Sequence, residues 1–146
     1  NVTFPNFVNK TIDVKKVDKS VIYLLFLGSI GVFAYIIVAP HIFKYFFPQY
    51  LDAITLTQIF SLSVIVYPAI YLLSGIMLAK NWVKSLYKIS IYNTITNVIF
   101  LLPLAYFYGI NGVVLAAIFN SIINFALFYI FFKKAHFILT FKLMIL

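Results

Sequence analysis

Four long apolar runs constrain the fold of this chain more than any other feature. They cover residues 20–39, 53–79, 89–107 and 112–132. About 20 mostly apolar residues are enough for a helix to cross the hydrocarbon core of a bilayer, whereas strands are much shorter and alternate in polarity. We therefore predict an all-α polytopic membrane protein with four antiparallel transmembrane helices.

The composition agrees with this class and excludes others. Of the 146 residues, 64% are hydrophobic and only 10% are charged, against about 25% charged in an ordinary soluble domain. The absence of cysteine excludes disulfides, thiolate nucleophiles and cysteine-bound metals. The spans also lack a pair of carboxylates, a Ser, His and Asp constellation, and any cluster with metal-ligand spacing. We therefore expect no enzyme, no catalytic residue, no metal and no cofactor.

The lysines flanking the spans predict the orientation of the chain. Segments 1–19, 40–52, 80–88, 108–111 and 133–146 hold four, one, three, no and three lysines. Lysine-rich flanks tend to stay cytoplasmic, so both termini are predicted on the cytoplasmic side. Residues 1–19 form a basic linker that is either an interfacial helix or a solvated connector, and residues 133–146 form a cytoplasmic tail. Because topology explains the net charge of +8, nucleic acid is not an expected partner.

Helix ends and kinks have their own signals. Asp18 and Ser20 are candidate N-caps of the first span, and Pro40 follows its predicted end. Pro68 lies in the middle of the second span and predicts a kink there. Small residues at threefold spacing predict a packing face on the first span. These are Gly28, Gly31 and Ala34.

Polar side chains at membrane depth are the candidate functional residues. On the fourth span, Gly112, Ala116, Asn120 and Asn124 recur at steps of four and share one face of a helix. Small and amide residues on one face allow close helix packing and interhelical hydrogen bonds. The stripe is therefore predicted to face protein.

The third span carries a similar pair, Asn93 and Asn97. Asn97 lies nine residues from Lys88, and Asn124 lies nine residues from Lys133, each about 13.5 Å at 1.5 Å per residue. Asn97 and Asn124 are thus predicted at one depth. Two roles stay open for these amides, interhelical bonding and the lining of a polar cavity.

The second span adds further polar candidates around its proline. Gln58, Tyr67 and Tyr71 are candidate cavity or interhelix residues, and ordinary packing is the alternative. No charged residue lies near the centre of any span, although such charges usually mark proton relays and ion coupling.

Several short motifs occur in a recognisable order. They are PQYLDA at residues 48–53, LAKNWVK at 78–84, Asn97, and YGINGVVLA at 108–116. In this order and spacing, the chain from Phe47 onward resembles the C-terminal region of polysaccharide flippases of the multidrug/oligosaccharidyl-lipid/polysaccharide exporter superfamily. Asn81 stands where that family often has glycine.

The resemblance implies a fold and a function. Family members have a dozen or more spans, so this chain would be part of a C-terminal lobe, with the remaining spans of the parent transporter as partners. The implied function is moving a lipid-linked oligosaccharide across the bacterial cytoplasmic membrane by alternating access. Two alternatives stay open, a multidrug exporter of the same superfamily and a self-contained four-span membrane scaffold or subunit.

Three lysines at the predicted cytoplasmic side are candidates for attracting an anionic headgroup. They are Lys80, Lys84 and Lys88. The alternative is that they only orient the connection between the second and third spans.

Overall fold

The computed structural model describes residues 14–144, with side chains for residues 14–137. Its elements are α2 (Val14–Phe46), the 3-10 helix η1 (Pro48–Ala53), α3 (Ile54–Ser61), the 3-10 helix η2 (Leu62–Val66), α4 (Tyr67–Ala79) and α5 (Val83–Met144). Every element of this described range is helical, which confirms the predicted all-α class. Most of the predicted basic linker and the last two residues of the tail lie outside the described residues.

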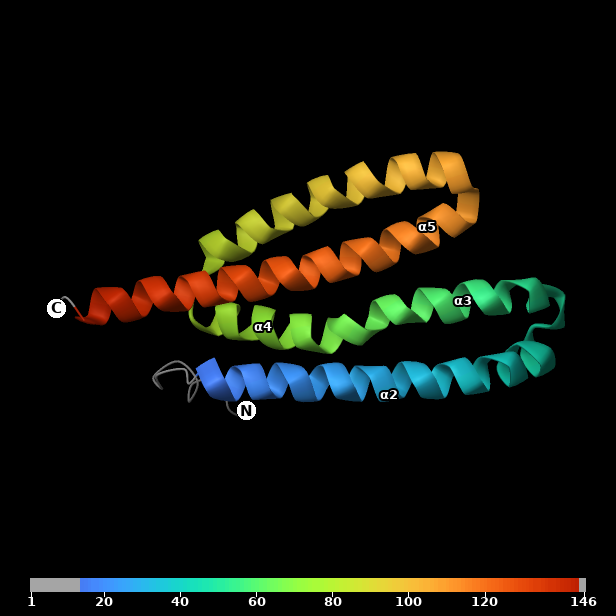
Figure 1. The fold of residues 1–146 in the computed structure, drawn as a ribbon, viewed down its shortest axis with the longest axis horizontal. Helices are drawn as coiled ribbons and strands as arrows, with labels where there is room; N and C mark the ends of the chain where they lie inside the picture. Colours follow the sequence, from blue (N-terminus) through green and yellow to red (C-terminus); the bar gives the residue numbers. More distant parts are fainter. Residues whose placement is uncertain (1–13, 145–146) are drawn as a thin grey trace.

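The number of spanning helices differs from the prediction of four. Three stretches of the described chain are long and apolar enough to cross a membrane, namely Val14–Phe46, Pro48–Ala79 and Val83–Phe137. The third and fourth predicted spans run together in α5. Gly109 interrupts α5 with a φ of 58° and a ψ of −134°, and the helix folds back on itself there (Figure 1). We call residues 83–108 the first arm of α5 and residues 110–144 its second arm.

The helices lie side by side in an order that differs from their order in the chain. The second arm of α5 lies between the first arm and the stretch formed by α3 and α4, while α2 lies on the far side of that stretch (Figure 1). The start of α2 and the end of α5 lie at one end of the molecule, and the reversal at Gly109 lies at the other. Sequence-distant helices are therefore neighbours, and the second arm is the central element.

The core is small and lies where α2, α4 and both arms of α5 meet. It consists of Val21, Ala69, Leu73, Met77, Ile89 and Phe132. Large apolar side chains cover the outside, among them Phe33 at 66% and Phe107 at 74% exposure. Exposed apolar surface on this scale needs lipid or further protein to cover it. The fold is therefore compatible with that of a helical membrane protein.

The helix α2 continues through Pro40 to Phe46, beyond the predicted end of the first span. Proline has no N–H, so the carbonyl of Ile36, four residues earlier, loses its partner within the helix. The Nε2 atom of Gln58 in α3 donates a hydrogen bond to this carbonyl at 2.9 Å. A side chain from the neighbouring helix thus satisfies the carbonyl that Pro40 leaves free.

The start of α2 also differs from the prediction. Because the helix begins at Val14, Asp18 and Ser20 lie inside it and the predicted N-caps are wrong. The Ser20 hydroxyl instead donates to the carbonyl of Lys16 at 3.0 Å. The residues between 14 and 19 were predicted as linker, but their backbone extends the first helix.

The bond between Gln58 and Ile36 gives a testable prediction. We expect Gln58→Leu to lower the free energy of unfolding by about 1–2 kcal/mol, because the partly buried Ile36 carbonyl loses its donor. Pro40→Ala restores an N–H for that carbonyl, so the same substitution should cost less than half as much in the Pro40→Ala background. Denaturation of the full chain in mixed micelles measures this double-mutant cycle.

Thr57→Val is the matched control for this cycle. The Thr57 hydroxyl donates to the carbonyl of Ile54 within its own helix turn. Removing this hydroxyl does not affect the Ile36 carbonyl, whose helical partner Pro40 removes. We expect its cost to be the same in both backgrounds. An equal cost of Gln58→Leu with and without Pro40 would contradict the assignment.

The irregularity predicted at Pro68 takes the form of a 3-10 stretch. The helix η2 ends just before α4, and Pro68 occupies the first turn of α4. Because Pro68 has no N–H to offer Val64, the Val64 carbonyl accepts instead from Tyr67, three residues on. The tightened turn places the Ile65 carbonyl against Gly28, where a Cβ would lie only 2.6 Å from that oxygen.

The predicted small-residue face of α2 therefore contacts protein at one position. Gly28 meets the backbone of η2, whereas a Cβ at Gly31 would find no heavy atom within 4 Å. Ala34 is exposed. Of the three small residues, only Gly28 is required for close packing among the described residues.

A tight turn joins α4 to α5. The N–H of Trp82 bonds to the Met77 carbonyl, and the N–H of Asn81 bonds to the Leu78 carbonyl, both at 2.9 Å. This pair of bonds is a Schellman motif, which needs a left-handed residue after the helix. Asn81 fills that place with a φ of 58°. The turn brings the start of the first arm beside the second arm, where the rings of Trp82 and Phe132 lie 6.0 Å apart.

Candidate functional site

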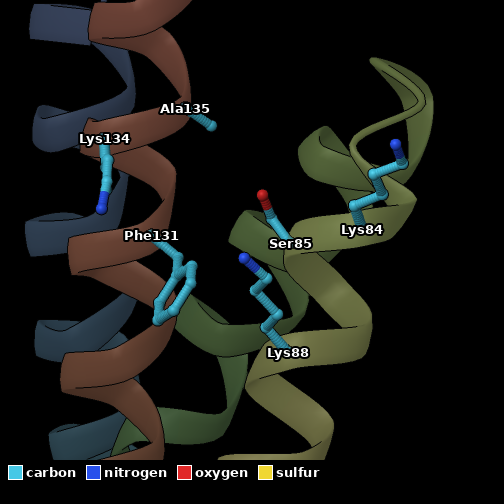
Figure 2. Close-up of a pocket in the computed structure, with 6 residues that line it drawn as sticks. All are labelled: Lys84, Ser85, Lys88, Phe131, Lys134 and Ala135. Carbon is cyan, nitrogen blue, oxygen red and sulfur yellow. The ribbon is translucent and has the colours of Figure 1, made fainter.

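A shallow pocket of about 150 Å³ lies between the two arms of α5, at the end of the molecule that holds the predicted cytoplasmic lysines. It is lined by Lys84, Ser85, Lys88, Phe131, Lys134 and Ala135. We call this the lysine pocket. The first three residues come from the first arm and the last three from the second, so the hairpin of α5 creates the pocket (Figure 2).

The helical repeat and the pairing of the arms position these side chains. Lys84 and Lys88 are four residues apart and share one face of the first arm. The rings of Tyr92 and Phe131 lie 6.1 Å apart and fix the level at which the arms meet. That register places Lys134, one turn beyond Phe131, across from Lys88.

Figure 2 shows how the three lysines are arranged. The Lys88 amine points into the gap between the arms, next to Ser85. Lys84 extends toward the preceding turn, and Lys134 runs along the side of the second arm. A lysine has a flexible four-carbon stem, so the amines of Lys84 and Lys134 can swing toward a bound anion.

The pocket has no acidic lining residue. The nearby acid, Asp18, is already engaged: it accepts a hydrogen bond from Tyr129 at 3.1 Å and pairs with Lys133 at 3.7 Å. The Lys133 amine also lies 4.5 Å from the centre of the Tyr129 ring. Tyr129 first, and then Asp18, raise the pKa of Lys133 above its ordinary value, although desolvation opposes them. The positive charge of Lys133 is thus balanced by the Asp18 carboxylate, whereas the charged residues that line the pocket are all lysines.

The predicted headgroup lysines divide into two groups. Lys84 and Lys88 line the pocket, but Lys80 does not. Three further lining residues, Lys134, Ser85 and Phe131, were not predicted as members of the same site. The sequence did contain a signal. Lys88 and Lys133 were both predicted at the cytoplasmic ends of neighbouring spans, so Lys134 could be expected near Lys88.

The amides form a second feature, separate from the pocket. The Oδ1 atoms of Asn93, Asn120 and Asn124 are buried and have no hydrogen-bond partner within the described part of the chain. Asn97 is exposed. The hypothesised bond between Asn97 and Asn124 is therefore not formed through the Asn124 oxygen.

The remainder of the predicted stripe lies against protein. Gly112 and Ala116 are buried, and a Cβ on Gly112 would clash with the Leu104 carbonyl of the first arm. The rings of Phe100 and Phe119 stack 6.1 Å apart between the same arms. Close packing near the reversal thus depends on the small residues of the stripe.

The second-span candidates do not share one site. Gln58 is committed to the Ile36 carbonyl. The hydroxyl of Tyr67 lies 3.5 Å from that of Ser121 on the second arm, while Tyr71 is 72% exposed and faces outward. None of these residues, and none of the predicted amides, lines the lysine pocket.

Comparison of the chain with protein-family models, curated proteins and solved structures found no match.

Proposed function

We propose that this chain is the C-terminal part of a bacterial flippase that moves a lipid-linked oligosaccharide across the cytoplasmic membrane. The observation that carries the proposal is where the flippase-like motifs fall in the fold. PQYLDA coincides with η1, LAKNWVK spans the turn from α4 to α5, and YGINGVVLA contains the reversal at Gly109. Motifs that resemble those of one transporter family thus lie at each change of direction between apolar helices.

The proposal includes two crossings of the membrane by α5. The 62 residues of α5 would extend about 93 Å as one straight helix, roughly three times the thickness of the hydrocarbon core. Folding at Gly109 gives each arm a length suited to one crossing. With α2 and the stretch from η1 to α4, the chain would cross four times, and both lysine-rich termini would lie in the cytoplasm.

Cysteine labelling tests this topology, and the 146 residues contain no cysteine of their own. We expect single cysteines at Gln49 and Asn111 to react with a membrane-impermeant maleimide in intact cells. Cysteines at Lys19, Asn81 and Lys134 should react only after the membrane is opened. Labelling of position 111 from the same side as position 81 would show that the first arm does not cross.

Deletion of the gene in its host tests the transported substrate. We expect loss of surface polysaccharide and accumulation of its lipid-linked precursor in the cytoplasmic leaflet, with complementation by the intact gene. Sensitivity to amphipathic cations without a polysaccharide defect would instead indicate a multidrug exporter. Loss of an assembled membrane complex, with neither transport phenotype, would indicate a scaffold.

A further inference from the structure

We propose that the lysine pocket binds the phosphate group of an anionic membrane phospholipid and thereby ties the two arms of α5 together at the membrane surface. The inference rests on membrane insertion alone and does not depend on which substrate, if any, the protein transports. It differs from simple attraction by the lysines of one connection, because Lys134 comes from the other arm.

The charge of the pocket favours an anion. Lys84, Lys88 and Lys134 all line one gap, and no lining residue is acidic. The Lys88 amine points into the gap (Figure 2), and the flexible stems of Lys84 and Lys134 let their amines reach an anion held there. The adjacent Lys133 is paired with Asp18, so the chain supplies a counter-charge next to the pocket but none inside it. Lysine binds phosphate as a compact point charge, and the Ser85 hydroxyl adds a hydrogen-bond donor.

The position of the pocket favours a lipid over a soluble phosphate. Phe131 lines it from the second arm, two residues before the lysines that end the last apolar run. An aromatic side chain next to lysines matches the boundary between acyl chains and headgroups. The glycerol end of a phospholipid can contact Phe131 while its phosphate meets the amines.

The single tryptophan of the chain provides a local probe. Trp82 lies two residues before Lys84 and packs on Phe132, with ring centroids 6.0 Å apart. The experiment uses the full chain in nanodiscs of phosphatidylcholine that contain a minor fraction of phosphatidylglycerol. Bromine atoms on the acyl chains of one lipid or the other quench Trp82 according to how often that lipid is its neighbour.

We expect brominated phosphatidylglycerol to quench Trp82 more strongly than brominated phosphatidylcholine at the same mole fraction. Lys84→Gln, Lys88→Gln and Lys134→Gln should each lower this preference about fivefold, the factor that corresponds to about 1 kcal/mol per lysine. Lys84→Arg keeps the charge and should keep the preference.

Lys19→Gln is the matched control, because Lys19 is exposed at the same end of the molecule and does not line the pocket. Diffuse attraction to the surface would make its effect equal to that of Lys84→Gln, and would overturn the proposal. So would equal quenching by both lipids, or loss of the preference on adding inorganic phosphate, which would indicate a site for soluble phosphate. Unchanged Trp82 emission without bromine verifies that each variant is folded.

Discussion

Gly112→Ala is expected to lower the free energy of unfolding by more than about 3 kcal/mol, the largest effect of any single substitution considered for this chain. A Cβ at this position would overlap the carbonyl of Leu104 on the first arm. Both groups belong to the backbone of packed helices, so no flexible side chain can move aside. The hairpin of α5 would have to open near its reversal.

Gly75→Ala is the matched control for this prediction. Gly75 also lies inside a helix, but a Cβ there would meet no heavy atom within 4 Å. Alanine is a better helix former than glycine, so we expect a change between zero and about 1 kcal/mol in favour of folding. Denaturation in mixed micelles measures both variants, and an equal, small effect of both would contradict the close approach of the two arms.

Gly28→Ala is expected to destabilise the protein by about 3 kcal/mol, at the upper end of the usual range for overpacking. The added methyl group would lie 2.6 Å from the carbonyl oxygen of Ile65. That oxygen belongs to η2, whose tightened turn is held between α3 and the proline-containing start of α4. Relief therefore requires α2 to move away from the neighbouring stretch.

Gly31→Ala, less than one helical turn away, tests whether this cost comes from packing. Gly31 lies on the same helix with open space around its Cα, so the substitution should be neutral or slightly stabilising. Thermal unfolding of the two variants in the same detergent compares them directly. A larger loss at Gly31 than at Gly28 would contradict the described contact between α2 and η2.

Apolar run lengths predicted the helical class of this protein well, because twenty uncharged residues have few stable alternatives in a bilayer. The helix that contains the first predicted span nevertheless continues past Pro40 to Phe46. Gln58, 22 residues after Ile36 in the chain, supplies the hydrogen-bond donor that Pro40 cannot give to the Ile36 carbonyl. The rule that proline tends to end a helix considers only neighbouring residues, so it does not include a hydrogen-bond donor from another helix.

The candidate site was only partly predicted, because it too depends on contacts between helices that are distant in the sequence. Spacing along one helix brought Lys84 and Lys88 together, but only the folded hairpin adds Lys134 from the second arm. Spacing also placed Gly112, Ala116 and the two later asparagines on one face of a helix. It did not predict that Asn97 would be exposed while the amide oxygen of Asn124 is buried.

The reversal at Gly109 has a consequence for access to the protein from outside the cell. Gly109 is the one residue inside α5 with non-helical backbone angles, and the connection from α2 to α3 is almost entirely occupied by η1. In the proposed orientation, neither connection provides an extended loop. Proteases need several residues of unfolded backbone, and antibodies usually need a protruding surface, so this part of the protein would offer little to either from that side.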